Sequence, residues 1–489
     1  MNILFNTFTG LQGSEVVRQL IKTYTPENCI CIIEEEKYIS EFRNLFSIVF
    51  SYRDAFSCNF EKFPHVKECL PIDEYLIKSM EKYENTIIKM MERNHTHSLD
   101  YDSRKRIYFK HLRYWNYILD IYNIDYFVCF NIPHEIFDYL IYCLCKVKGI
   151  RVIASYISPI MEYSYLVEDI ESPCPEIAIE YKKLLLEYKD SDIDEISLSG
   201  DFNSNFEKYI NTNNDITPYY MKSKSRPWAK DIKRPLIYLK KLIINTKKNK
   251  IKIALNKLRY IFSNIRLSRQ LNNYYDKHAQ EVDLGQKYIY APLHFQPECT
   301  TCPMGGVYVY QYLYIEMISY YLPEGVLIYV KEHPMQKLLG RDLKLYKDLL
   351  RMHNVRLVPR QLDTYTLLDN CIAVASVTGT AGFEGLFRNK PFLMFGSFIN
   401  QYAPGVYNIR NNEDCRKALS EVLNKKDFVS IKELKIYMAA LERVTFHGYY
   451  DDGSYNTDYP INDNIKCTFK AFKNKIDRTL NNANGGVMK

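Results

Sequence analysis

Short apolar runs separated by amphipathic stretches open the chain. Met1–Phe8 is typical of a buried strand, and Ser14–Tyr24 after it has the apolar spacing of a helix. The same order recurs at Asp125–Asn131, a strand, and Pro133–Val147, a helix that leads into another strand. Because strand, helix and strand at this spacing form a parallel βαβ unit, the pattern predicts a doubly wound, Rossmann-like α/β domain over residues 1–160.

A second region of alternating strands and helices covers residues 285–410. Strands are expected at Lys287–Pro292 and Gly325–Val330, with a helix between them. This predicts a second doubly wound domain, followed over residues 411–489 by helices and a tail that is disordered from Asn481. Two such domains in tandem face each other across a cleft, and ligands bind at the carboxyl ends of their strands.

Residues 161–284 interrupt this alternation with a helical, basic insertion. A helix is expected at Glu176–Tyr188 and a polar loop at Ser191–Thr217. The stretch Lys222–Gln270 then holds sixteen Lys and Arg against a single acid, Asp231, whereas the whole chain has a net charge of +7. Since the positive charge is confined to one segment instead of surrounding a site, we expect no nucleic-acid partner. A basic amphipathic helix that lies on an anionic membrane is one interpretation, and a solvated helix packed on a domain is the other.

Composition narrows the class of protein. The 489 residues are 47% hydrophobic and 25% charged, which indicates a globular protein of about two domains and excludes a collagen-like or wholly disordered chain. The 13 cysteines are scattered and many lie in apolar runs, as in a reducing compartment. Met1–Glu15 lacks a basic n-region, and Phe127–Cys145 carries charged residues that a spanning helix avoids. We therefore expect a cytoplasmic location, with peripheral attachment to the inner membrane if the basic helix binds lipid.

The most informative stretch runs from Ser376 to Glu384, where a strand ends in a turn of hydroxyl and glycine residues before a helix. Such a turn offers backbone N–H groups and hydroxyls to a phosphate, and a carboxylate one helical turn later suits the hydroxyls of a ribose. The alternative is an ordinary capped helix. No Gly-Lys-Ser/Thr follows, so this is not a Walker loop. The candidate nucleotide-binding residues here are Ser376, Thr378, Gly379, Thr380 and Glu384.

Two other strand ends of the second domain carry polar side chains. Lys331 and His333 follow one strand, and either side chain could donate to a phosphate oxygen. His294, Gln296 and Glu298 follow another, and Glu298 pairs a carboxylate with a nearby imidazole. Two loops from one domain that point at one cleft favour a ligand site over a structural role.

The matching place in the first domain holds His134 and Glu135, directly after a predicted strand. They are candidates for acid–base chemistry across the cleft, although a helix that starts with a proline and an acid is equally typical of structure. Cys299 and Cys302 lack a second ligand pair at metal spacing, so we expect no metal.

Taken together, these stretches resemble the bacterial capsule polysaccharide biosynthesis family, which includes the capsule Kdo transferases. The matching pieces are NIPHEIFDYLIYCLCKVKGIRV (Asn131–Val152), YAPLHFQPECTTCPMGG (Tyr290–Gly306), YVKEHP (Tyr329–Pro334), VASVTGTAGFEGLFRNKPFLMFG (Val374–Gly396) and APGV (Ala403–Val406).

The resemblance implies a GT-B glycosyltransferase that acts on bacterial surface polysaccharide. The second domain would hold a nucleotide-sugar donor, with CMP-Kdo or another CMP-nonulosonate implied by one branch of the family, and the first a glycan or lipid-linked acceptor. His333 and the 376–380 turn would contact donor phosphate and Glu384 the ribose, while the catalytic choice among Glu135, His134 and Glu298 stays open. Two alternatives remain, a sugar-nucleotide 2-epimerase and a non-catalytic factor of envelope assembly.

Overall fold

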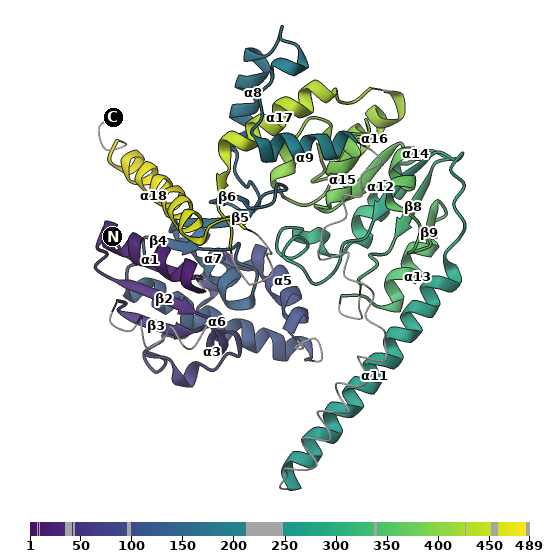
Figure 1. The fold of residues 1–489 in the computed structure, drawn as a ribbon. Coiled ribbons are helices and arrows are strands. Elements are labelled where there is room, and N and C mark those ends of the chain that lie inside the picture. Colours follow the sequence, from purple (N-terminus) through teal and green to yellow (C-terminus); the bar gives the residue numbers. More distant parts are fainter. Residues whose placement is uncertain are drawn as a thin grey trace.

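The computed structural model describes the chain except for residues 7, 9, 35–41, 43–44, 95–98, 212–247, 337–339, 426, 451–457 and 486–489. Within the described residues the chain forms two α/β domains, each built around its own sheet (Figure 1). This confirms the predicted fold class, two Rossmann-like domains of the GT-B type.

The first sheet has the strand order β13-β6-β5-β4-β1-β2-β3. Its five parallel strands, read from β3 to β5, follow the 3-2-1-4-5 order of a Rossmann fold. The short strands are almost wholly apolar because helices cover both faces. The elements are β1 (Ile3–Asn6), α1 (Gly10–Tyr24), β2 (Cys29–Ile33), β3 (Ile48–Ser51), α3 (Tyr52–Phe56), α4 (Glu74–Ser79), α5 (Glu81–Met90), the 3₁₀ turn η2 (Met91–Asn94), α6 (Tyr101–Ile121), β4 (Tyr126–Cys129), α7 (Ile136–Lys148) and β5 (Arg151–Ile157).

This sheet extends beyond the domain expected at residues 1–160. Strand β6 (Tyr163–Val167) pairs antiparallel with β5, and the two-residue strand β13 (Phe446–His447) pairs with β6. The C-terminal helix α18 (Ile461–Gly485) returns to pack against α1, where its Phe472 and Ile476 are fully buried. A strand of two residues carries no apolar pattern, so the pairing of β13 with the first sheet could not be predicted from the sequence.

The second sheet has six parallel strands in the order β9-β8-β7-β10-β11-β12, which is the 3-2-1-4-5-6 order of a dinucleotide-binding fold. The predicted strands and helices of this domain are confirmed to within a few residues. They are β7 (Tyr288–Pro292), α12 (Tyr312–Tyr321), β8 (Leu327–Lys331), α13 (Leu343–Arg351), β9 (Val355–Val358), α14 (Thr364–Asn370), β10 (Ala373–Ser376), α15 (Thr380–Leu386), β11 (Phe392–Met394), β12 (Val406–Asn408) and α16 (Asn412–Asn424).

Three helices cover one side of the second domain (Figure 1). The predicted helix α8 (Glu176–Glu187) packs against α17 (Ile431–Val444). The expectation of a loop at Ser191–Thr217 is wrong over α9 (Gly200–Ile210), which also packs against α17. The Tyr209 ring of α9 stacks 4.8 Å from Phe387. The apolar residues of α9 recur at helical spacing among polar ones, and their burial against α17 outweighs the poor helix propensity of its Gly and Asn residues.

The basic segment is described only from Lys248, where helix α11 (Lys248–His278) begins, and this confirms the predicted helical spacing there. Helix α11 extends away from the second domain, with only its C-terminal part against the core (Figure 1). The predicted disordered tail is contradicted up to Gly485, because α18 continues that far, and residues 486–489 lie outside the described chain.

Candidate active site

The order of strands reverses between β7 and β10, and ligands of doubly wound domains bind at such a switch point. His294 follows β7 and the loop Ser376–Thr380 follows β10, so the fold brings these two predicted stretches together. The backbone N–H of Thr378 donates to Nε2 of His294 at 3.0 Å. A Cβ added at Gly379 would lie 2.9 Å from Oγ of Ser376 and 3.2 Å from that same Nε2, so the close approach of loop and ring requires glycine.

His294 and His333 each have one ring nitrogen occupied by a backbone N–H. For His333 the donor is Met335, whose N–H lies 3.2 Å from Nδ1. Burial lowers the pKa of His294 to about 3 and that of His333 to about 4, so both rings are neutral at pH 7. Their hydrogen bonds therefore leave an N–H on Nδ1 of His294 and on Nε2 of His333. Each ring can donate one hydrogen bond to a ligand.

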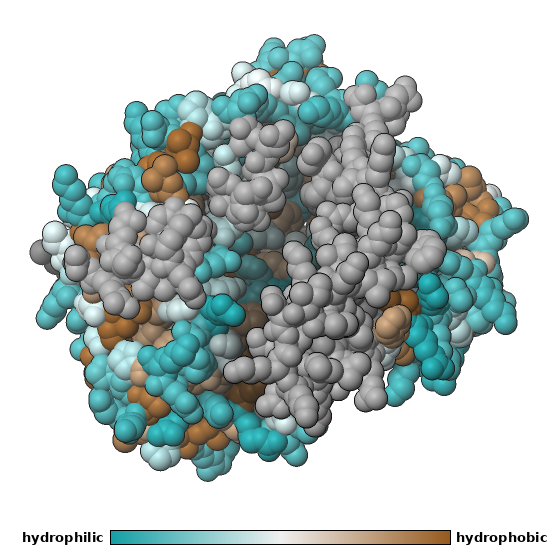
Figure 2. Space-filling model, turned by 60° about the horizontal axis from the view of Figure 1, so that its bottom comes forward, coloured by the Kyte–Doolittle hydropathy of each residue, from teal (hydrophilic) through white to brown (hydrophobic). Residues whose placement is uncertain are grey.

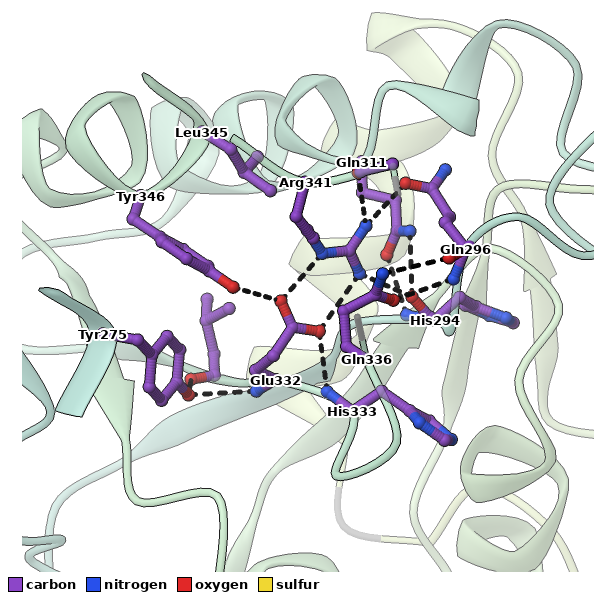
Figure 3. Close-up of polar contacts among 12 residues, drawn as sticks. Tyr275, His294, Gln296, Gln311, Glu332, His333, Gln336, Arg341, Leu345 and Tyr346 are labelled. Atoms are coloured by element: carbon purple, nitrogen blue, oxygen red, sulfur yellow. Dashed lines mark hydrogen bonds and ion pairs between the residues drawn. The ribbon is translucent and has the colours of Figure 1, made fainter. Parts of the chain in front are cut away.

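A buried ion pair between Arg341 and Glu332 links the loop that carries His294 to the loop that carries His333; these are called the two histidine loops (Figure 3). Nε of Arg341 donates to the Glu332 carboxylate at 2.7 Å, and a second nitrogen donates to the carbonyl of His294 at 2.5 Å. The same carboxylate accepts the backbone N–H of His333 at 2.7 Å and the Tyr346 hydroxyl at 2.6 Å. Both imidazoles point away from the pair (Figure 3). Arg341 and Tyr346 were not among the predicted site residues, because nothing in their spacing distinguishes them from the start of an ordinary helix.

Gln296, predicted to face the cleft, is 5% exposed and serves this same network. Its side-chain oxygen accepts from Arg341 at 2.5 Å and its amide donates to the carbonyl of Val309 at 2.7 Å. The side chain is therefore a structural link between loops.

Lys331 is the last residue of β8 and is 6% exposed. Its ammonium donates to the carbonyl of Leu362 at 2.5 Å and to the hydroxyl of Thr364 at 2.9 Å. Burial lowers its pKa to about 8, although the nearby charge of Asp363 opposes this. An ammonium has three N–H donors and these contacts use two. The third can donate a hydrogen bond to an anion at the carboxyl edge of the sheet.

Glu384 lies in α15 and is 9% exposed. Burial raises the pKa of its carboxyl, while the hydroxyls of Thr380 and Tyr365 and the charge of Arg388 oppose that rise. Helix α15 has only seven residues, so the backbone N–H groups of the turn matter more here than a helix dipole. Thr380 itself is exposed at the rim.

The catalytic candidates come from both domains. His134 and Glu135 follow β4, at the switch point of the first sheet, and His134 Nδ1 lies 2.6 Å from the carbonyl of Ile132. That contact places the proton on Nδ1 and leaves Nε2 as an acceptor, while burial and the charge of Arg93 lower the ring's pKa. Burial raises the pKa of Glu298, which accepts a hydrogen bond from Thr300 at 3.1 Å.

No group of three or more metal-ligating side chains gathers anywhere in the described chain. Burial raises the pKa of the Cys299 thiol to about 12 and that of Cys302 to about 11, which makes both unreactive at pH 7. Among the described helices, none is both long and apolar enough to span a bilayer.

The protein has two doubly wound domains in tandem, with polar side chains at the switch point of the second sheet. This arrangement defines a protein of the GT-B class. Residues 316–424, from α12 to the end of α16, match the family model described as capsule polysaccharide biosynthesis protein. This match confirms the resemblance seen in the sequence, and the matched stretch contains Lys331, His333 and the 376–384 turn. No curated protein is found to match the chain.

Several solved structures align along most of the chain at low identity. The UDP-GlcNAc 2-epimerase of Methanocaldococcus jannaschii is 12% identical, with 90% of this chain and 99% of that chain covered and a TM-score of 0.27. The Thermosulfurimonas dismutans β-Kdo 2,7-transferase KpsC is 10% identical, with 82% and 97% covered and a TM-score of 0.30. The UDP-GlcNAc 2-epimerase of Neisseria meningitidis is 11% identical, with 97% and 100% covered and a TM-score of 0.23. Such scores carry no argument about function, and the fold is assigned from the strand order.

Proposed function

We propose that this protein is a glycosyltransferase of bacterial surface-polysaccharide synthesis that uses a nucleotide-sugar donor. The observation that carries the proposal is the switch point of the second sheet, where His294 presents a neutral N–H beside the Ser376–Thr380 loop and His333 presents another at the end of the neighbouring strand β8. The family match of residues 316–424, which includes His333 and this loop, supports it.

In this proposal the two imidazoles and Lys331 stabilise the leaving nucleotide. Negative charge develops on the phosphate oxygen as the glycosidic bond to the donor breaks. Hydrogen-bond donors held at fixed positions by Arg341, Glu332 and the backbone stabilise that charge without having to reorganise. Glu384 would accept hydrogen bonds from the ribose hydroxyls.

The acceptor side needs a group that takes a proton from the attacking hydroxyl, or a carboxylate nucleophile. Nε2 of His134 carries the lone pair of a neutral ring, which suits a general base. Glu298, whose pKa burial raises, suits proton donation, and Glu135 is the third candidate. These three residues lie on both sides of the cleft, as a reaction between two bound sugars requires.

We further propose a CMP-nonulosonate such as CMP-Kdo as donor and a glycan or lipid-linked glycan as acceptor. The nonulosonate assignment rests on the resemblance of the YVKEHP and SVTGTAGFE stretches to the capsule Kdo transferases. A lipid-linked acceptor would place the enzyme at the membrane, where the basic segment 222–270 could hold it. On the face in Figure 2 the described hydrophobic residues are scattered, so charge would supply most of that attachment.

A ligand screen tests the proposal. Thermal melting is measured with CMP, UDP and GDP, and a ligand present at a hundred times its Kd should stabilise the folded protein by about 2.7 kcal/mol. We expect CMP to raise the melting temperature most. If UDP or GDP does so instead, the donor assignment is wrong while the transferase remains, and if none binds, the protein is a non-catalytic factor.

Product analysis then separates the two enzyme classes. The nucleotide sugar that binds is incubated with and without a glycan acceptor, and the sugars are followed by mass spectrometry and NMR. A transferase forms the new linkage only when acceptor is present. Inversion of the donor sugar at carbon 2 without acceptor would establish a 2-epimerase and overturn the proposal.

A further inference from the structure

Arg93 joins the two domains beside the catalytic candidates. It lies in the 3₁₀ turn η2 at the end of α5, and its side chain is only 11% exposed. One terminal nitrogen donates to the carbonyl of His134 in the first domain at 2.5 Å. The other donates to the carbonyl of Cys302 in the second domain at 2.8 Å. One planar guanidinium thereby fixes a loop of each domain relative to the other.

The other polar contacts that cross between the domains beside Arg93 are weaker. The Cys302 thiol approaches the carbonyl of Thr86 at 3.7 Å, and the Lys89 ammonium lies 4.8 Å from the centre of the Tyr310 ring. A small cavity lies along this seam, between α5–η2 on one side and residues 296–302 on the other. Within the described chain, the strong polar link here is therefore the one through Arg93.

The charge of Arg93 also reaches both candidate carboxylates. The guanidinium lies 3.8 Å from the Glu135 carboxylate. Burial raises the pKa of Glu298, and the charge of Arg93 opposes that rise. Arg93 thus stands between an acid of the first domain and an acid of the second. The other titratable groups that face it are His134 and Asp138 at the start of α7, Cys299 and Cys302 in the second domain, and Lys89 and Glu92 on its own element.

We propose that Arg93 is a positioning residue of the transfer reaction, which holds the His134–Glu135 edge and the Glu298 loop at the separation that the two bound sugars need. The proposal rests on the transferase function above. A group bonded to both loops can set their spacing, and a displacement of about 1 Å between reacting groups costs about 100-fold in rate. Donor nucleotide affinity should not depend on Arg93, because the switch point of the second sheet is built without it.

The test compares Arg93→Met and Arg93→Lys with a matched control, Arg113→Met. Arg113 also donates to two backbone carbonyls, those of Cys69 and Leu70, but both lie in the first domain. We expect Arg93→Met to lower kcat about 100-fold while the Kd for the nucleotide, measured by calorimetry, changes less than about twofold. The alkaline limb of the kcat–pH profile should move to higher pH, because Glu298, which must be protonated to donate its proton, loses the cation that favours its ionised form.

Arg93→Lys separates charge from geometry. A lysine keeps the cation but cannot reach two carbonyls with a rigid fork, so the pH limb should return towards that of the parent while kcat stays low. Arg113→Met should lower the melting temperature and leave kcat and the pH profile unchanged. If Arg93→Met does not fold, the kcat of Arg93→Lys is compared with that of the parent instead.

The outcomes distinguish this inference from the proposed function. A parent enzyme that transfers sugar, with Arg93 variants that match it in kcat and pH profile, overturns the positioning role alone. An equal loss of kcat in Arg113→Met would make Arg93 merely structural and also overturn it. A parent that binds no nucleotide and transfers nothing removes the proposed function and this role together.

Discussion

Arg341 and Glu332 are both almost fully buried, and together they contact the backbone of both histidine loops. Two opposite charges taken out of water are stable only while each keeps its partner. The pair therefore fixes the local geometry more than it adds stability. If one of the two residues were removed, the charge of the other would be left buried without a partner and would destabilise the fold.

Replacement of Arg341 by Met should lower the local free energy of unfolding by about 3–5 kcal/mol, because Glu332 is left buried and unpaired. Hydrogen exchange of the β7 and β8 amides measures this. The double variant Arg341→Met/Glu332→Gln should recover part of the loss, since the orphan charge is gone. Arg351→Met, at an exposed ion pair with Asp348, should change little. An Arg341→Met effect as small as that of Arg351→Met would contradict the assignment.

His111 in α6 is fully buried, and neither ring nitrogen has a partner among the described residues. Burial lowers its pKa in the folded protein to about 3, whereas in the unfolded chain its pKa is near the ordinary histidine value of about 6.5. Stability from this group is thus fully present above pH 6.5 and is lost as the pH falls towards 3, because the unfolded state then binds the extra proton.

The variant His111→Leu should remove this dependence. Its stability relative to the parent should rise by about 1.4 kcal/mol per pH unit as the pH falls from 6.5 to 5. Urea unfolding followed through the fluorescence of Trp115, which lies one turn further along α6, measures it. His353→Leu, at an exposed histidine, is the control and should leave the pH dependence unchanged. Parallel pH curves for parent and His111→Leu would refute the prediction.

At the scale of elements, the loop after β10 works because it can approach the loop after β7 very closely. The Thr378 hydroxyl donates to the carbonyl of Thr300 at 2.9 Å and its N–H to His294, which leaves no room for a side chain at Gly379. The proposed nucleotide site therefore depends on the contact between these two loops.

Gly379→Ala should weaken nucleotide binding by at least about tenfold, since the added Cβ displaces Ser376 and His294 and costs one or two hydrogen bonds. The protein should still fold, because α15 and β10 keep their packing. Gly200→Ala, at the start of α9, has no atom within 4 Å of the added Cβ and should bind nucleotide as the parent does. Calorimetry measures the affinity of each variant for the nucleotide found in the screen. Equal affinity in both variants would show that the phosphate binds elsewhere.

For the whole molecule, helix α11 departs from the second domain (Figure 1). On this helix Phe262 is 58% exposed and Leu267 is 45% exposed. A basic helix with these apolar side chains exposed is available to an anionic surface. Lipid attachment and sugar transfer would then be separable functions of the molecule.

Reversal of Lys248, Lys250, Lys252 and Lys257 to Glu should abolish binding to anionic liposomes at low salt, because each basic residue near the surface contributes about 1 kcal/mol. Transfer to a soluble acceptor should persist. The control reverses four exposed lysines of α8 and α13, namely Lys182, Lys183, Lys344 and Lys347. Flotation assays across a salt series measure the liposome binding of the parent, the α11 variant and the control. Liposome binding equal to that of the parent would make α11 a solvated helix, and loss of soluble transfer would assign it to the acceptor site.

The sequence by itself determined the parallel βαβ units and the strand-end positions of His134, His294, His333 and the 376–384 turn. These follow from local periodicity, since a strand or helix reports its burial through its own apolar spacing. The resemblance to the capsule family likewise rests on contiguous stretches, and the family match confirmed it.

Only the tertiary structure decided which strand ends meet. The reversal between β7 and β10 places His294 against Thr378, and the return of the chain adds β13 and α18 to the first domain. It also showed Arg341 beneath both histidine loops and Arg93 across the domain seam. The physical reason is that an arginine acts through partners far away in the chain, so its role has no local pattern, whereas the strands that position those partners do.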